Sequence, residues 1–126
     1  PDVSHPIMAG TTGKSRYLEA IRLGKAVSLR DGSPITIQCE AKTASQWHPP
    51  VTLSSSQPCG TTSQSKALEA LKLSLISTDA ARYDIYYNTH LSWVGWQGWK
   101  KNGEVAGDRP GSHVEAVMIK LVEKSN

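Results

Sequence analysis

One short sequence pattern occurs three times in this chain of 126 residues. Each copy has a glycine, a small polar loop, a serine, an aliphatic–Glu–Ala step and then alternating apolar residues. The copies span residues 10–23, 60–73 and 107–121, and the glycines that open them lie 50 and 47 residues apart. A repeat of that period is typical of proteins built from similar structural units, so it constrains the fold more than any other motif does.

Taken alone, the second copy is ambiguous between a helix and a strand. Residues 65–73 are rich in Ala, Leu, Lys and Glu, which have high helix propensity. The third copy, however, contains the β-branched residues Val114, Val117 and Ile119, which favour strands. Apolar and polar residues also alternate from Leu71 to Leu75, with the period of a half-buried strand. We therefore predict that all three copies form strands.

The repeat divides the chain into three units within a single domain. These are an incomplete first unit (1–32), a second unit (33–77) and a third unit (78–126). A chain of this length can bury about two-thirds of its unfolded surface in one core. The first copy begins so close to residue 1 that the front half of its unit is missing. A removed segment, another chain that supplies the missing part, or a fold that tolerates an incomplete unit would each explain this.

The third unit is the most complete and predicts the order of strands within a unit. Residues 83–91 alternate as a strand, with Ile85, Tyr87 and Leu91 on one face. A tryptophan-rich segment follows, and Asn102-Gly103 predicts the turn of a hairpin. In the rest of the chain we expect a hairpin turn at residues 31–32, a strand near residues 35–41 and a link between units at residues 77–81.

Composition excludes some classes of partner. The formal net charge is +3, and the basic residues are spread along the chain with acids between them, unlike the clustered basic face of a nucleic-acid-binding protein. No stretch is apolar enough to cross a membrane, and no signal segment stands at the front. We therefore expect no membrane insertion and, if the protein is exported, the mature form. Cys39 and Cys59 leave both a disulfide and two reduced thiols open.

Motifs for catalysis or cofactor binding are missing. Residues 10–15 read Gly-Thr-Thr-Gly-Lys-Ser, but a phosphate-binding loop needs a further glycine where Met8 stands. The four histidines show no metal-ligand spacing, and no motif arranges a serine, a histidine and an acid for nucleophilic catalysis. We therefore predict no catalytic residues, no metal and no cofactor.

A glutamate recurs at the same place in each copy of the repeat, as Glu19, Glu69 and Glu115. Each shares the parity of the inward-facing residues of its predicted strand, and an acid at the mouth of a core must be hydrogen-bonded. We expect each carboxylate to bind backbone N–H groups of its own glycine loop and so to clamp that loop. Metal or ligand binding is the alternative.

The tryptophans of the third unit are the strongest functional signal. Trp93, Trp96 and Trp99 recur at every third residue with a glycine in each interval, which leaves ring faces open. Aligning the second unit with the third places Trp47 near Trp96, so these two are expected to serve the fold. Trp93 and Trp99 have no counterpart in the second unit and are therefore free to bind a partner. The alternative is that all three rings fill the core.

Polar residues near these tryptophans complete the predicted site. Aromatic faces suit the apolar faces of sugar rings, and polar side chains can hydrogen-bond the sugar hydroxyls. For the histidine on the preceding strand, a purely structural role is the alternative. The predicted main site consists of Trp93, Trp99, His90, Lys101 and Asn102, and the loop residues Thr12, Thr62 and Asp108 are candidates for a repeated ligand-binding site.

The third unit resembles the clostridial hydrophobic repeat with conserved tryptophan, the ChW repeat. The resemblance rests on Gly95-Trp96-Gln97-Gly98-Trp99, on residues 102–107 and on residues 114–121, and residues 9–21 are similar to the tail of the same repeat. It covers nearly the whole chain but is degenerate in the second unit, where Trp47-His48-Pro49-Pro50 replaces the Gly-Trp-Gln-x-Trp core. The third unit also has one residue fewer between Ser112 and Glu115. Repeats of this family occur in extracellular proteins, so the resemblance implies secretion and binding to sugars or proteins at surfaces.

Together these observations predict an all-β domain with pseudo-threefold organisation, a β-prism in preference to a β-trefoil, because each unit is too small to bury its own face. The predicted function is that of a secreted, non-catalytic carbohydrate-binding module, with glycans or a surface polymer as partners and no nucleic acid. The competing class is a protein-interaction or assembly module, in which the same tryptophans are anchors against another polypeptide. An enzyme ranks last.

Overall fold

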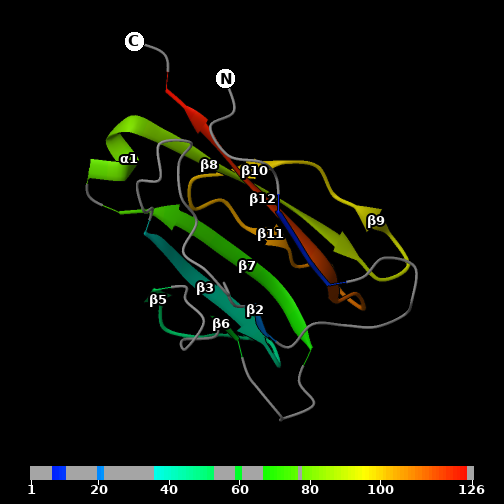
Figure 1. Cartoon of the computed structure of the whole chain (residues 1–126). Helices are drawn as coiled ribbons and strands as arrows, with labels where there is room; N and C mark the ends of the chain where they lie inside the picture. Colours follow the sequence, from blue (N-terminus) through cyan, green and yellow to red (C-terminus); the bar gives the residue numbers. More distant parts are fainter. Residues whose placement is uncertain are drawn as a thin grey trace.

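The computed structural model of this chain describes residues 7–10, 20–21, 36–52, 59–60, 67–76 and 78–124; for residues 7–10 and 20–21 it describes the backbone alone. Nearly all of the described elements are strands, as Figure 1 shows, which confirms the predicted all-β class. The strands are β1 (Ile7–Gly10), β2 (Ala20–Ile21), β3 (Ile37–Thr43), β4 (Gln46–Trp47), β5 (Val51–Thr52), β6 (Cys59–Gly60), β7 (Leu68–Leu75), β8 (Tyr83–Leu91), β9 (Gly95–Trp96), β10 (Lys100–Lys101), β11 (Ala106–Gly107) and β12 (Val114–Glu123).

The short helix α1 (Thr78–Arg82) lies between β7 and β8, where the sequence predicted only a link. An acid in its first turn, Asp79, accepts a hydrogen bond from the Thr36 backbone N–H at 3.2 Å. At the other end, the carbonyl of Arg82 accepts a hydrogen bond from the Lys124 N–H at 2.9 Å. These contacts fix the crossing from one sheet to the next at the ends of β3 and β12.

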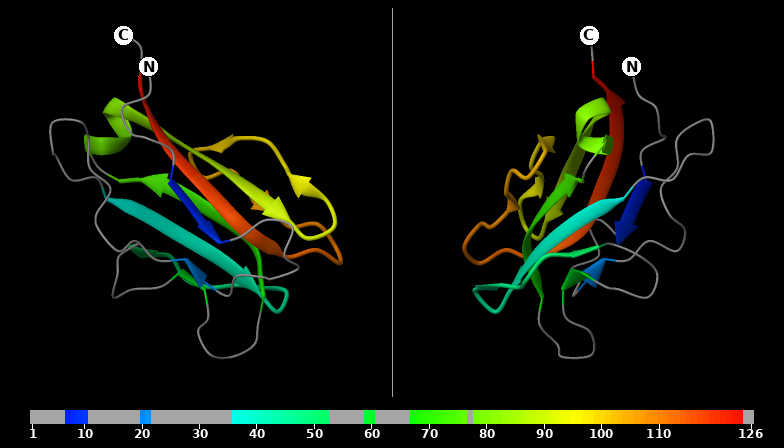
Figure 2. Two further views of the ribbon diagram at one scale, coloured as in Figure 1. Left: turned by 45° about the vertical axis from the view of Figure 1, so that its right-hand side comes forward. Right: turned by 90° about the vertical axis from the view of Figure 1, so that its left-hand side faces the viewer.

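The long strands form two antiparallel five-stranded sheets that run obliquely across the molecule (Figures 1 and 2). The first has the order β1-β12-β8-β10, with β9 also paired to β8. The second has the order β11-β7-β3-β4, with β5 also paired to β3. A third, two-stranded sheet joins β2 to β6.

The second and third units pair their strands in the same way. In the second unit, β3 pairs with β4, with β5 and with the long strand β7. In the third unit, β8 pairs with β9, with β10 and with the long strand β12. The two units thus share a pairing scheme, while the exact unit boundaries stay a prediction.

The glycine that opens each copy of the repeat pairs with a different unit. Gly107 lies opposite Ala70, Gly60 lies opposite Ala20, and Gly10 lies opposite Ala116. In each case a strand from one unit therefore joins the sheet of another, and every junction has a glycine across from an alanine. Small residues allow the two backbones to meet closely at the edges of the sheets.

The core lies between the sheets and is built from the inward-facing residues of the long strands. β7 is a strand, as the alternation of its leucines predicted, and Leu71, Leu73 and Leu75 are all buried. On β8 the side chains of Ile85, Tyr87 and Leu91 face inward, also as predicted. Removal of these side chains from water is the main force that holds the sheets together.

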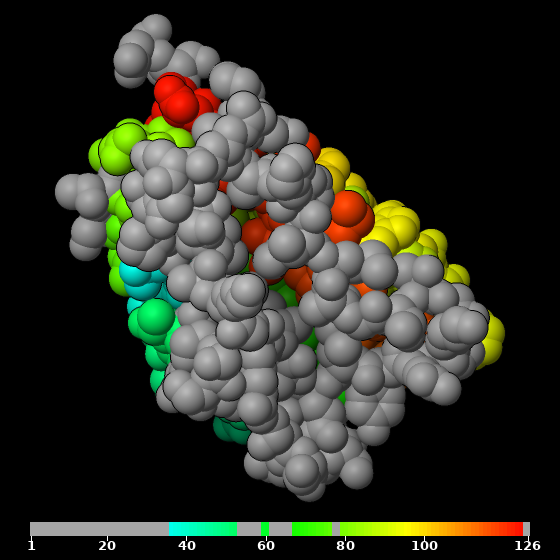
Figure 3. All heavy atoms as spheres, in the orientation of Figure 1, coloured from blue at the N-terminus to red at the C-terminus, as the bar shows by residue number. Residues whose placement is uncertain are grey.

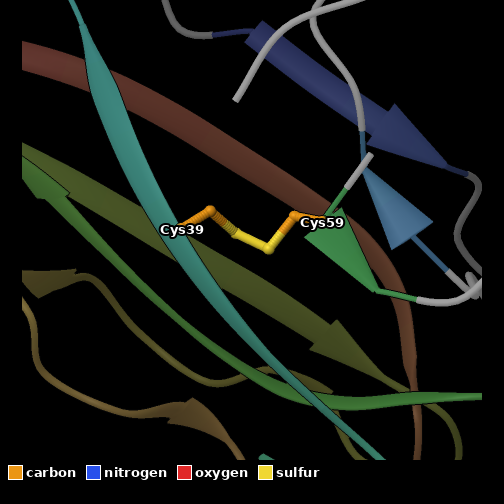
Figure 4. Close-up of a disulfide and its surroundings, with 2 residues drawn as sticks. All are labelled: Cys39 and Cys59. Carbon is orange, nitrogen blue, oxygen red and sulfur yellow. A yellow bond between two sulfur atoms is a disulfide. The ribbon is translucent and has the colours of Figure 1, made fainter. Parts of the chain in front are cut away.

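Cys39 and Cys59 form a disulfide, the alternative that the sequence left open. Figure 4 shows it running from β3 to β6, and both residues are buried in the core. Because β6 pairs with β2, the bond connects the β3 sheet covalently to the two-stranded sheet.

The predicted hairpin at Asn102-Gly103 is half right. Both residues have positive φ, of 45° and 84°, and the Glu104 N–H donates to the Lys101 carbonyl at 3.1 Å, which makes a tight turn. The flanking strands do not pair with each other, however, because β10 pairs with β8 and β11 pairs with β7. The turn therefore connects a strand of the first sheet, β10, to a strand of the second sheet, β11. The other predicted hairpin turn, at residues 31–32, lies outside the described residues.

Candidate functional site

A β-bulge occurs at the same place in the second and third units. In the third unit Leu91 pairs with Val114 and His90 pairs with Ala116, so Glu115 is the extra residue on β12. In the second unit the ladder of β3 and β7 shifts in the same way and leaves Glu69 as the extra residue. A bulge bends its strand and redirects the side chains beside it, and bulges are over-represented next to functional sites.

The buried carboxylate of Glu115 is one wall of the candidate site. Only 4% of Glu115 is exposed, and its Oε1 lies 3.0 Å from Nδ1 of His90. The His90 ring in turn meets the Trp96 ring edge-on, with 5.2 Å between the ring centroids. The predicted partner of Glu115 was the glycine loop, whereas its partner in the structure is His90.

The other glutamates have different outcomes. Glu69 does hold a backbone N–H through its carboxylate, as expected, but the donor is Ser45 at 2.8 Å, in the turn between β3 and β4. The predicted donor was the glycine loop of the same unit; residues 61–66 of that loop lie outside the described residues, so a bond from Glu69 to that loop stays a prediction. Glu19 lies outside the described residues.

Trp93 occupies the turn that follows β8, and it is 89% exposed. Its φ of 67° lies in the left-handed region that bulky residues rarely adopt. The residue before it anchors the turn, because Ser92 accepts hydrogen bonds from the Ser112 hydroxyl at 3.0 Å and from the His113 N–H at 3.1 Å. The Ser92 N–H also donates to the His113 carbonyl at 2.9 Å. The backbone is therefore held while the indole points into solvent.

A cavity of about 320 Å³ lies between this turn and the bulge. We call it the Trp93 pocket. Leu91 contributes a buried apolar wall, while the tryptophan stands at the exposed side. Its lining includes His90, Ser92, Trp93, Val94, Gly95 and Glu115.

The remaining tryptophans are half-exposed, so none of the four is sealed inside the chain. The ammonium of Lys120 lies 4.4 Å from the centroid of the Trp99 ring, and Lys72 lies at the same distance from Trp47. Trp47 pairs with Lys42 and Trp96 pairs with His90, so the two occupy matching places, as the alignment of units predicted. In Figure 3 the yellow atoms around β9 and β10 lie at the right-hand edge of the molecule.

The predicted site residues do not all gather in one place. Trp93 and His90 line the Trp93 pocket at one end of β8. Lys101 pairs with Tyr86 towards the other end of that strand. The Asn102 side chain accepts a hydrogen bond from the Ile85 N–H at 3.0 Å and donates one to Asp84 at 2.7 Å, so its amide is engaged within the chain.

Among the candidates for a repeated site, the structure describes only Asp108. Its carboxylate forms an ion pair with Lys42 at 2.7 Å and lines a second cavity. Thr12 and Thr62 lie outside the described residues. Sequence reasoning did not select Ser92 or Glu115 as lining residues of a pocket; the recurrence of the glutamate was a usable signal, whereas nothing distinguished Ser92 from other loop serines.

In the described part of the chain, no group of three or more His, Cys, Asp and Glu side chains is placed to hold a metal ion. None of the described helices has the length and apolar character that crossing a membrane requires. Searches against models of protein families, against curated proteins and against solved structures found no match for the chain.

Proposed function

We propose that this protein is a non-catalytic carbohydrate-binding module whose main site is the Trp93 pocket. The open face of Trp93 would stack on the apolar face of a sugar ring, and His90 and the carboxylate of Glu115 would hydrogen-bond its hydroxyls. A hydrogen bond to a charged group is stronger than one between neutral groups, so Glu115 would fix the orientation of the sugar.

The observation that carries this proposal is the backbone conformation of Trp93. A residue other than glycine in the left-handed region costs about 1 to 2 kcal/mol, and an exposed indole recovers little of that by burial. Strain of this kind persists where the surroundings hold it and clusters at functional sites. The anchored turn around Ser92 provides that support and presents the ring at the mouth of a cavity.

The wider setting of the proposal is a secreted protein of the ChW repeat family with a pseudo-threefold β-prism fold. The matching pairing schemes of the second and third units and the three glycine–alanine junctions support the threefold arrangement. The buried disulfide supports an oxidising, extracellular environment, since such bonds are rare in the cytosol. These features bear on the fold and its location, and the sugar-binding function depends on the pocket.

A glycan array followed by titration of the best-binding oligosaccharide tests the proposal. We expect Trp93→Ala to weaken binding up to about tenfold, which corresponds to the stacking energy of one aromatic ring. Trp47→Ala is the control, because Trp47 on β4 is also a solvent-accessible tryptophan but does not line the Trp93 pocket. An array with no bound glycan, or equal losses in the two variants, would contradict the assignment.

The second candidate function is a protein-interaction or assembly module. It is favoured by the apolar neighbours Trp93 and Val94, which are both exposed on one turn and would suit an anchor buried against another polypeptide. Sedimentation equilibrium over a range of concentrations separates the two functions. If the wild type forms an oligomer that the Trp93→Ala substitution dissociates, and no glycan on the array binds, the results would support assembly in place of sugar binding.

A further inference from the structure

A second cavity, of about 270 Å³, occupies the same place in the second unit as the Trp93 pocket does in the third. We call it the Glu69 pocket. Glu69 is the bulge residue of β7, as Glu115 is of β12. Lys42, which comes one residue before the end of β3, matches His90 on β8, and Ser45 lies in the turn that corresponds to the turn of Trp93.

The Glu69 pocket is closed by a segment from the next unit. The segment after β11 contributes Asp108 and Arg109 to its lining, and the Asp108 N–H donates to the Glu69 carbonyl at 2.9 Å. Asp108 has a φ of 65°, so this wall also holds a residue in the left-handed region. The cavity therefore lies at a junction between units, where β11 joins the sheet of β7.

The chemistry of the two pockets differs. Among the described residues that line the Glu69 pocket there is no aromatic side chain, and the charged ones are two cations, Lys42 and Arg109, and two carboxylates, Glu69 and Asp108. Lys42 and Asp108 neutralise each other in an ion pair at 2.7 Å. One oxygen of Glu69 holds the Ser45 N–H, and the other oxygen and the Arg109 guanidinium form no hydrogen bond or ion pair with other described residues.

From this arrangement we infer that the Glu69 pocket is a second, independent sugar site, which makes the protein bivalent. The four charges of the described lining residues sum to zero, which favours a neutral ligand over a charged one. The other Glu69 oxygen and the Arg109 guanidinium line the same cavity, and neither bonds to another described residue, so together they offer a strong acceptor and several donors that suit the hydroxyls of a neutral sugar ring. The site uses hydrogen bonds where the Trp93 pocket uses stacking. The inference rests on the proposed function of the Trp93 pocket.

The test follows backbone amides by NMR while the full chain is titrated separately with methyl β-glucoside, methyl β-galactoside and methyl α-mannoside. Gly111 and Ser112 report on the Glu69 pocket, and Val94 and Gly95 report on the Trp93 pocket. We expect both sets to shift and to saturate at different sugar concentrations. Trp93→Ala should remove the shifts of the Trp93 pocket alone.

The double variant Asp108→Asn, Arg109→Gln should do the reverse, with at least a tenfold loss of affinity at the Glu69 pocket. Asparagine tolerates the left-handed conformation at position 108, so the loop should keep its fold. Shifts confined to the Trp93 pocket, or shifts at Gly111 and Ser112 that the double variant retains, would overturn the second site and leave the proposed function intact. No shift at either pocket with any of the three sugars would overturn both.

Discussion

At the scale of single residues, the third unit gives up stability at some positions and gains it at others. Trp93 adopts a left-handed backbone with its ring in solvent, which is unfavourable for the fold. Tyr87 does the opposite, because its ring is fully buried and its hydroxyl donates to the Glu104 carbonyl. The contrast separates a residue that stabilises the core from a residue whose side chain the fold leaves exposed.

Replacing Trp93 with asparagine should separate stability from binding. Asparagine visits the left-handed region readily, so we expect Trp93→Asn to raise the free energy of unfolding by up to about 1 kcal/mol. The same variant should lose sugar binding at the Trp93 pocket, because the stacking face is gone. Urea unfolding and a sugar titration measure the two effects. A variant destabilised by the substitution would show that the indole contributes to the fold.

Burial raises the pKa of the Tyr87 hydroxyl above its ordinary value near 10. Because the folded state holds this proton more tightly, the contribution of Tyr87 to stability is complete below about pH 10 and is lost as the pH rises further. Tyr87→Phe should therefore cost about 1 kcal/mol at neutral pH through the lost hydrogen bond, and should show a smaller fall in stability above pH 10. Urea unfolding at a series of pH values measures both. Parallel pH profiles for the two proteins would contradict the assignment.

At the scale of elements, the bulges and the strand junctions depend on each other. Gly107 on β11 lies against β7 beside the bulge residue Glu69, and the next residue, Asp108, bonds to the Glu69 carbonyl. A Cβ on Gly107 would come within 2.8 Å of that carbonyl oxygen. The glycine that opens the repeat is therefore required by the close approach of two backbones.

Two glycine variants separate this close approach from backbone strain. Gly107 and Gly111 both have positive φ, of 91° and 80°, but a Cβ at Gly111 would meet no atom within 4 Å. Gly111→Ala should cost about 1 to 2 kcal/mol through strain alone. Gly107→Ala should cost about 3 kcal/mol or more, because it adds a clash with the backbone of β7. Equal losses in thermal or urea unfolding would show that the junction has room for a side chain.

At the scale of the whole molecule, the sheets are held together by strands exchanged between units and by one covalent bond. Each of the three glycine strands pairs with a strand from another unit, so the described sheets combine strands from different units. The disulfide adds a link from the β3 sheet to the pair β2–β6. The fold therefore depends on contacts between residues that are far apart in the sequence.

Removing the disulfide should destabilise the whole domain. Cys39 and Cys59 are 20 residues apart, and closing a loop of that length in the unfolded chain corresponds to about 3 kcal/mol. We expect Cys39→Ala, Cys59→Ala to lose about that much free energy of unfolding. Urea unfolding with and without a reductant provides the control, because the reductant should weaken the wild type and leave the double variant unchanged. If the reductant leaves the free energy of unfolding of the wild type unchanged, the result would contradict this account.

The sequence by itself determined the strand character of the second and third copies of the repeat and the inward-facing residues of their strands, whereas most of the first copy lies outside the described residues. The alternation of Leu71, Leu73 and Leu75 with polar residues suits one local geometry, and a period of two is a property that neighbouring residues express directly. The exposure of Trp93 was one of two alternatives that the sequence left open, and the structure decided between them.

Only the tertiary structure decided which groups meet. Asn102 has a side chain that could bind a sugar, yet its amide forms hydrogen bonds with Ile85 and Asp84. The fold brings these two residues beside it. Glu115 entered the pocket because a register shift between distant strands places its carboxylate against His90. Such contacts depend on the pairing of strands that are far apart in the sequence. A local sequence pattern does not indicate which strand will pair with which.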